Sequence, residues 1–256
     1  MRRAALTKGI VILFVLGCVR EAAAGYIYQT GFEKPSFTTG PLAGQGGWSV
    51  FGFSPAAVTV QDSVAMTGKQ AVRVNAAAVG QNQVGPWHSD PFDTATSANK
   101  TVVVDAEVLL KSSSKLTSWQ FAALTPNLGT FFGGFNVLLD GRLQLITAGF
   151  PQTQPVITRD VWNHFEVRYD FPDQTFDVLI NNSLVAGKVP FYTSQTVYGT
   201  LLFDTFGDGN DQGFLDNVSI QDVSTQAVPE PSTIVLFGMG GLALLGYRLR
   251  RQRRPV

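Results

Sequence analysis

Residues 162–171 read WNHFEVRYDF, and from His164 onward polar and apolar side chains alternate. A period of two is typical of a β-strand with one buried and one solvated face. The apolar members of the stretch would then face a core, and His164, Glu166 and Arg168 would face solvent. The stretch therefore predicts a half-buried strand of an antiparallel sheet.

The same alternation recurs through residues 25–227. The clearest further strands are Thr101–Lys111, Phe135–Leu139, Arg142–Thr147, Thr175–Ile180, Tyr198–Phe206 and Gly213–Val223. Turn dipeptides separate several of them, namely Asp140-Gly141, Pro172-Asp173 and Asn181-Asn182. No window in this region has a sustained helical period. About a dozen short strands without a linker or repeat predict one all-β domain, a two-sheet sandwich or jelly roll.

The first 24 residues have the layout of a secretory signal peptide. Basic residues precede the apolar run Gly9–Gly17, and the small residues 22–24 follow it. The run is shorter than the roughly 20 residues of a transmembrane helix, so we expect cleavage by signal peptidase between Ala24 and Gly25. A second interpretation stays open: the residues before Cys18 resemble a bacterial lipoprotein cleavage site, which would leave Cys18 as a lipidated N-terminus.

The C-terminal segment 228–256 has three parts. A short motif comes first, and its residues are Val228, Pro229, Glu230, Pro231, Ser232 and Thr233. Its two prolines favour an extended, accessible peptide. A predicted transmembrane helix over 233–249 and an arginine-rich tail over 248–256 follow. The arginines are expected to stay cytoplasmic, which would leave the preceding domain on the outer side of the membrane.

This order of elements resembles the PEP-CTERM sorting signal of Gram-negative bacteria. The resemblance implies recognition of the Pro-Glu-Pro motif by exosortase, a membrane cysteine protease-transpeptidase. It implies an exported protein, first inserted in the inner membrane and later placed at the cell surface or in the extracellular matrix. The alternative is a plain single-span anchor, which needs no Pro-Glu-Pro element.

The charges of the domain exclude some functions. Residues 25–227 carry 10 basic and 17 acidic side chains, a net charge of −7. Such a domain lacks the positive surface that nucleic acids require. Because Cys18 is the single cysteine of the chain, zinc fingers and disulfide frameworks are excluded as well.

A second resemblance extends over nearly all of residues 30–222. It rests on an ordered series of short motifs: Gly31-Phe32-Glu33, Gly46-Gly47-Trp48, Thr67–Val74, Trp162–Val167 and Gly213–Ile220. The series is similar to concanavalin A-like lectin/glucanase jelly rolls and to jelly-roll carbohydrate-binding modules. The resemblance implies a structural Ca²⁺ ion held by Glu33, a carbonyl in the region of Lys69, and Asp216. An EF-hand is rejected, because the loop that begins at Asp208 has Ser219 where a bidentate Glu belongs.

The sequence contains few candidate catalytic residues. Glycosidases of this fold use two carboxylates in a Glu-x-Asp-x-Glu strand motif, and the nearest match, Asp105-Ala106-Glu107, lacks the first Glu. His164 and Glu166 are further candidates for a glycosidase or lyase. A polar outer strand face explains the same pattern and is favoured. We therefore predict a protein without catalytic residues.

Sugar binding requires exposed aromatic rings and nearby hydrogen-bonding groups. Trp87 and Trp119 are the predicted binding residues, whereas Trp48 and Trp162 are assigned to the core. Further candidates are the rings of Phe131 and Phe132, and the polar side chains of Asn82, Gln83 and Asn136. The favoured function is a non-catalytic exported protein that binds, or lies within, extracellular polysaccharide or biofilm matrix. The alternatives are a polysaccharide-active enzyme and a purely structural matrix protein.

Overall fold

The computed structural model describes residues 25–51, 55–76, 83–88, 100–112, 118–126, 128–206 and 212–223. The predicted signal peptide and the predicted sorting tail lie outside these residues, so their boundaries stay predictions. The described part is built almost entirely of strands, with one short 3₁₀ helix, η1 (Pro55–Ala57). None of its helices has the length and hydrophobicity to cross a membrane.

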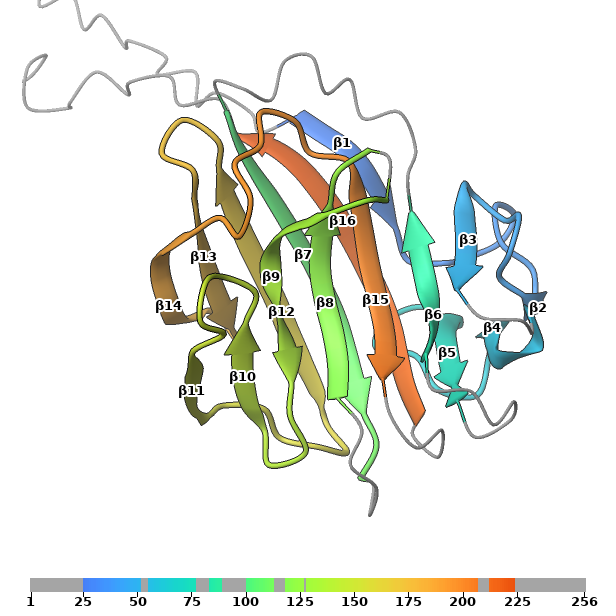
Figure 1. The fold of residues 1–256 in the computed structure, drawn as a ribbon. Helices are drawn as coiled ribbons and strands as arrows, with labels where there is room; N and C mark the ends of the chain where they lie inside the picture. Colours follow the sequence, from blue (N-terminus) through green and yellow to red (C-terminus); the bar gives the residue numbers. More distant parts are fainter. Residues whose placement is uncertain are drawn as a thin grey trace, which may run out of the picture.

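The strands form two antiparallel sheets stacked face to face (Figure 1). The nine-stranded sheet has the order β14 (Ser183–Pro190), β13 (Thr175–Ile180), β12 (Trp162–Asp170), β7 (Thr101–Leu110), β16 (Gln212–Val223), β5 (Ala71–Asn75), β4 (Val58–Gln61) and β2 (Gly40–Pro41), and β1 (Gly25–Thr30) also pairs with β16. The seven-stranded sheet has the order β11 (Gln152–Pro155), β10 (Arg142–Leu145), β9 (Phe131–Val137), β8 (Ser118–Leu124), β15 (Thr200–Phe206), β6 (Gln83–His88) and β3 (Trp48–Phe51). The predicted two-sheet, all-β fold is confirmed.

The predicted turns connect neighbouring strands. Asn181 and Asn182 both have positive φ angles, of 50° and 64°, between β13 and β14, as a tight two-residue hairpin turn requires. Gly141 follows Asp140 with a φ of 81°, and the Asp140 side chain accepts a hydrogen bond from the backbone N–H of Arg142 at 3.1 Å. Local turn chemistry therefore fixes the register of these two hairpins.

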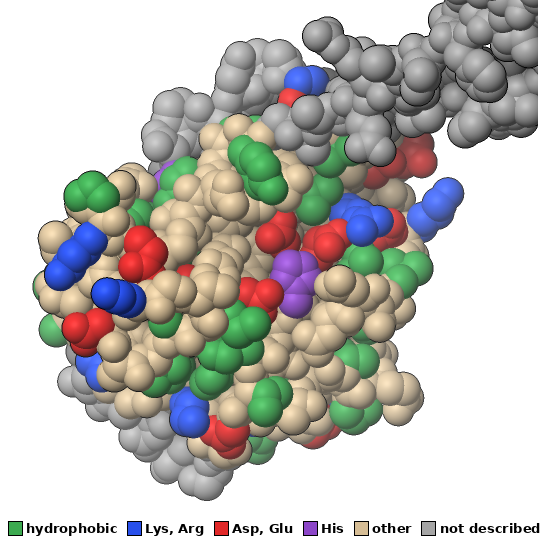
Figure 2. Space-filling model, turned by 180° about the vertical axis from the view of Figure 1, so that it is seen from behind, with side chains coloured by type: hydrophobic (Ala, Val, Ile, Leu, Met, Phe, Trp, Pro, Cys, Tyr) green, Lys and Arg blue, Asp and Glu red, His purple; other side chains and the backbone are tan. Residues whose placement is uncertain are grey.

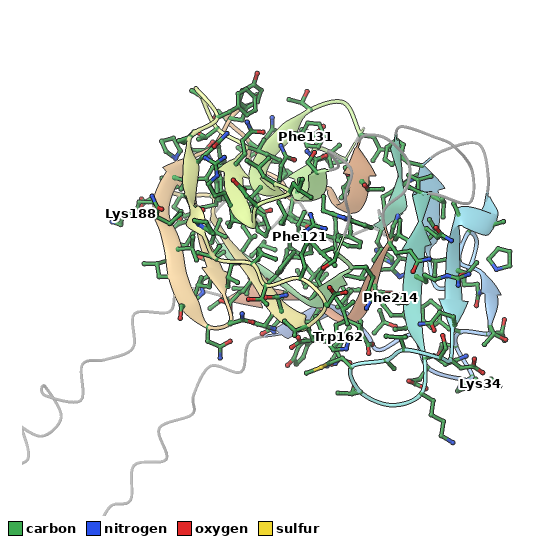
Figure 3. The ribbon with its side chains drawn as sticks, turned by 90° about the horizontal axis from the view of Figure 1, so that it is seen from below. Lys34, Phe121, Phe131, Trp162, Lys188 and Phe214 are labelled. Atoms are coloured by element: carbon green, nitrogen blue, oxygen red, sulfur yellow. The ribbon has the colours of Figure 1, made fainter. Side chains whose placement is uncertain are left out.

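Aromatic side chains fill the space between the sheets (Figure 3). Phe121 of β8 and Phe135 of β9 both meet Phe165 of β12 edge to face, at centroid distances of 5.7 and 5.3 Å. Fully buried Trp48 belongs to this core, as predicted, and donates its indole N–H to Tyr28 Oη at 2.8 Å. In the nine-stranded sheet, alternating strands such as β12 bury one face and leave the other half-exposed, whereas β8 of the seven-stranded sheet is buried on both faces.

Candidate functional site

Charged side chains gather on the outer face of the nine-stranded sheet, over β7 and β12 (Figure 2). The pairing of β12 with β7 places His164 opposite Glu107, and Glu166 opposite Asp105. On the other side of β7, the strand β16 places Ser219 opposite Asp105. The sheet order therefore brings together the four residues that the sequence suggested for catalysis.

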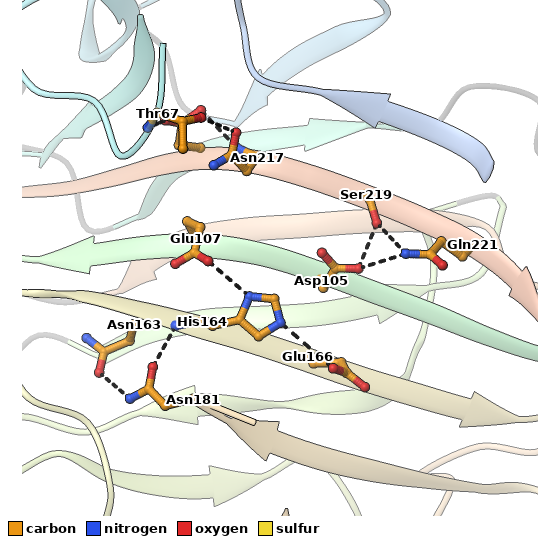
Figure 4. Close-up of polar contacts among 11 residues, drawn as sticks. Thr67, Asp105, Glu107, Asn163, His164, Glu166, Asn181, Asn217, Ser219 and Gln221 are labelled. Atoms are coloured by element: carbon orange, nitrogen blue, oxygen red, sulfur yellow. Dashed lines mark hydrogen bonds and ion pairs between the residues drawn. The ribbon is translucent and has the colours of Figure 1, made fainter. Parts of the chain in front are cut away.

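His164 lies between two carboxylates (Figure 4). Its Nδ1 atom is 3.2 Å from Glu107 Oε1, and its Nε2 atom is 3.8 Å from Glu166 Oε2. The other oxygen of Glu166 accepts a hydrogen bond from Arg168 Nε. The backbone N–H of His164 is held by Asn181 Oδ1 at 2.9 Å. These contacts fix the imidazole ring between Glu107 and Glu166.

Asp105 has a different environment. Its Oδ2 atom accepts hydrogen bonds from Ser219 Oγ at 2.7 Å and from Gln221 Nε2 at 3.4 Å. Burial raises the pKa of Asp105 above its usual value, and the nearby charge of Glu166 acts in the same direction. The protonated form of Asp105 is thus more accessible than that of a solvated aspartate.

A groove of about 550 Å³ runs beside these groups. Its lining consists of Thr101, Val103, Asp105, His164, Glu166, Arg168, Gln221 and Val223. This volume lies within the range of small-ligand sites. We name this feature the polar groove. It presents hydroxyl, amide, carboxylate, imidazole and guanidinium groups on a rigid sheet, which suits a ligand rich in hydroxyl groups.

Trp162 corrects one assignment to the core. It lies half-buried on the same face of β12 as His164, two residues away, and opposite Leu109 of β7. Asn163 takes the inward position instead, because its amide donates to the carbonyls of Thr158 and Val161 at 2.8 and 3.0 Å. A partly exposed indole ring therefore lies on the face that holds the polar groove.

Trp119 corrects a predicted binding residue. Its ring is fully buried and stacks on Phe203 of β15 at 5.2 Å. The position of Gly213 leaves room for it, since a Cβ atom there would lie 2.5 Å from the ring. Trp119 is a core residue and has no surface on which a sugar can stack.

The other ring candidates are divided between core and surface. Trp87 is half-buried on β6, with its ring 6.0 Å from that of Phe51, and stays a predicted binding residue. Phe131 is half-buried, whereas Phe132 is fully buried. Of the polar candidates, Asn136 is half-buried on β9, and Asn82 lies outside the described residues.

Glu33 and Asp216 meet at one loop, as the calcium prediction requires. Glu33 Oε1 accepts hydrogen bonds from the backbone N–H groups of Lys69 and Gln70, at 2.6 and 2.9 Å. Asp216 Oδ2 accepts from Met66 and Thr67, at 2.9 and 3.2 Å. Burial raises the pKa of Asp216, and the charge of Glu33 adds to the rise. Two carboxylates beside one loop repel each other, and a hard cation between them would offset this repulsion.

Within the described ranges, no group of three or more His, Cys, Asp or Glu side chains is placed to hold a metal. A Ca²⁺ ion here would need carbonyl oxygens beside Glu33 and Asp216, which Ca²⁺ accepts. The calcium site therefore stays a proposal. The region of Lys69 contributes backbone N–H groups to Glu33 in this structure, and its predicted carbonyl ligand is untested.

Removal of calcium is expected to lower the melting temperature by about 5–10 °C. Binding to the folded state alone adds about 2.7 kcal/mol when the ion is 100-fold above its Kd, and each kcal/mol shifts the melting temperature of such a domain by about 2–4 °C. Asp216→Asn should remove the dependence on Ca²⁺, and Asp173→Asn should keep it. Differential scanning calorimetry with Ca²⁺ and with chelator measures both, and identical curves for the unmodified protein would exclude the ion.

Comparisons with known proteins agree with this architecture. Residues 227–254 match the PEP-CTERM protein-sorting motif, which confirms the sequence resemblance. No curated protein matches the chain in sequence. The fold is similar to that of a sialidase, with a TM-score of 0.52 and 12% identity over 78% of this chain. The match covers 19% of the sialidase, so this chain spans less than a fifth of that protein.

Two smaller solved proteins are similar as well. A carbohydrate esterase from the Shiga toxin-encoding bacteriophage phi24B has a TM-score of 0.54 and 12% identity, and the match covers 77% of this chain and 98% of the esterase. The CBM22-1 xylan-binding domain from Paenibacillus barcinonensis has a TM-score of 0.40 and 17% identity, with 79% and 97% of the two chains covered. The first of these likenesses, at this identity, supports the jelly-roll fold alone.

Two residues that hold Asp105 at the polar groove were missed by sequence reasoning. Ser219 and Gln221 hold Asp105 but lie 114 and 116 residues away in the chain. Their positions in an alternating strand were a signal for the outer face, but the pairing of β16 with β7 is a property of the whole sheet. The order of the strands therefore determines which residues surround the groove, and this order could not be predicted from the sequence.

Proposed function

We propose that this chain is an exported protein of a Gram-negative bacterium, inserted in the inner membrane and processed by exosortase, whose sandwich binds polysaccharide without cleaving it. The sorting-motif match supports export and processing. The observation that carries the binding proposal is the half-buried Trp162 on the same face as the polar groove. An aromatic ring beside fixed hydrogen-bonding groups is the combination that sugar recognition uses.

The contacts of the carboxylates favour binding over catalysis. Glu107 is next to His164, and Glu166 is hydrogen-bonded to Arg168. Asp105 is held by Ser219 and Gln221. Side chains fixed in this way are preorganised to accept hydrogen bonds from sugar hydroxyls. The released domain would then act at the cell surface or in the extracellular matrix.

Truncation of the indole ring tests the binding surface. Trp162→Ala is expected to weaken binding to soluble polysaccharides about tenfold or more, since a central aromatic residue often dominates a binding site. Leu184→Ala is the matched control, because Leu184 is an exposed apolar side chain on edge strand β14. Affinity electrophoresis of the full chain in mild detergent, in gels that contain each polysaccharide, measures the effect. Equal retardation of both variants and the unmodified protein would remove the groove from the proposal.

One observation favours hydrolysis as a second candidate. Glycosidases pair a protonated carboxyl group with an ionised one, and Asp105, whose pKa is raised by burial, lies opposite Glu166. The binding proposal predicts no reducing-sugar release from any polysaccharide that the protein binds. Release that disappears in Asp105→Asn and in Glu166→Gln, but persists in Asp173→Asn, would establish the enzyme instead.

A further inference from the structure

A row of polar side chains crosses the outer face of the seven-stranded sheet. Strand pairing aligns Asp204 of β15 with Gln120 of β8, and Gln120 with Asn136 of β9. The alignment continues from Asn136 to Gln144 of β10, and from Gln144 to Gln152 of β11. Five neighbouring strands thus contribute one polar residue each, and at about 4.8 Å per strand the row is about 19 Å long. We name it the amide row.

The amide row lies on the face opposite the core. On β8 the neighbours of Gln120 are Trp119 and Phe121, and both belong to the core cluster. Burial decreases along the row: Asp204 and Gln120 are buried, Asn136 and Gln144 are half-buried, and Gln152 is exposed. The row therefore has one open end and one deep end.

Hydrogen bonds orient the amides but leave one buried atom without a donor. Gln120 Nε2 donates to Asn136 Oδ1 at 2.9 Å, and Asn136 Nδ2 donates to Gln144 Oε1 at 3.1 Å. Gln120 is 5% exposed, and its Oε1 atom accepts no hydrogen bond from the described residues. A buried acceptor that is left unpaired destabilises the folded protein. A hydroxyl group of a ligand would satisfy this atom.

A second row, two residues further along the strands, supplies an apolar floor. Trp87 of β6 lies opposite Leu202 of β15, and Leu202 lies opposite Ala122 of β8. Ala122 in turn lies opposite Gly134 of β9. Leu202, Ala122 and Gly134 are buried, and the half-buried ring of Trp87 stands at one end of this row. The two rows together place one aromatic ring beside a line of amides.

We propose that this face is a second carbohydrate site, which binds a segment of a neutral polysaccharide along the amide row. Amides both donate and accept hydrogen bonds, as sugar hydroxyls do. The described members of the two rows include no Lys, Arg or His, so a polyanion finds no basic partner there. The inference goes beyond the proposed function: a charged groove on one sheet and a row of amides on the other let one domain bind two glycan chains.

A pair of matched substitutions tests the second site. Gln120→Leu removes the amide from the row, and Gln29→Leu makes the same change at an exposed position of β1, which belongs neither to the row nor to the lining of the polar groove. Affinity electrophoresis of the full chain in mild detergent uses hydroxyethylcellulose as the neutral probe and alginate as the anionic probe. Gln120→Leu is expected to weaken binding to hydroxyethylcellulose about tenfold, and Gln29→Leu is expected to leave it within twofold. In gels that contain alginate, the Gln120→Leu variant should migrate like the unmodified protein.

The melting temperature separates binding from folding. Gln120→Leu should keep or raise it, because an apolar side chain replaces a buried group with an unpaired acceptor. Trp87→Ala, a change at a half-buried ring, should weaken the same binding independently. Neutral-probe binding that survives both Gln120→Leu and Trp87→Ala, or that is lost equally in Gln29→Leu, would overturn the second site. If the unmodified protein binds none of the polysaccharides tested, the second site and the proposed function are both wrong.

Discussion

Replacement of Pro229, Glu230 and Pro231 by alanine is expected to abolish processing of the precursor. These residues lie near the start of the segment 227–254 that matches the PEP-CTERM motif. From the sequence, the two prolines are expected to favour an extended peptide, the form in which a protease can bind it. Alanine, the best helix former, removes this preference for an extended peptide. The full-length precursor should then accumulate in the membrane fraction, as immunoblots against the domain would show.

The matched control for this experiment changes the three residues just before the motif. Ser224, Thr225 and Gln226 precede the matched segment 227–254, and their replacement by alanine should leave processing intact. Normal processing of the Pro-Glu-Pro variant would reduce the tail to a plain membrane anchor. It would also remove exosortase from the proposed partners.

Truncation of Trp119 is expected to have the largest effect on stability. Removing a fully buried tryptophan side chain costs about 3–5 kcal/mol, a large share of the about 5–15 kcal/mol that stabilises a typical domain. The melting temperature should fall by roughly 10 °C or more. Trp87→Ala, at a half-buried ring, should cost far less. Thermal unfolding followed by circular dichroism measures both.

The same pair of variants decides between two interpretations of Trp119. The burial of its ring against Phe203 predicts that stability falls and that polysaccharide binding of the folded fraction is retained. A Trp119→Ala protein that melts normally but no longer binds sugar would restore the sequence-based prediction. It would then place the ring at a binding surface.

Local patterns predicted the fold well. β7, β12, β13 and β16 occur where side chains alternate, and the hairpin at Asn181-Asn182 follows from turn chemistry alone. The failures have local causes too. Trp162 and Asn163 were ambiguous, because alternation does not say which of two adjacent residues points inward. The amide of Asn163 donates hydrogen bonds to two backbone carbonyls, and these bonds allow Asn163 to point inward while Trp162 points outward.

The two candidate binding surfaces required knowledge of strand order. The amide row exists because β8 lies between β15 and β9, and Gln120 is 84 residues from Asp204 in the chain. The polar groove depends in the same way on β7, which lies between β12 and β16. Non-local pairing is set by the packing of the whole core, which no single window of sequence encodes.

A glycan array probed with the labelled full chain tests the central claim most directly. The claim is that the sandwich binds carbohydrate through its outer faces. We predict binding to neutral polysaccharides, and its loss in the double variant Trp162→Ala, Gln120→Leu when the melting temperature of that variant is close to that of the unmodified protein. Absence of binding to every glycan on the array by a protein that unfolds cooperatively would contradict the account.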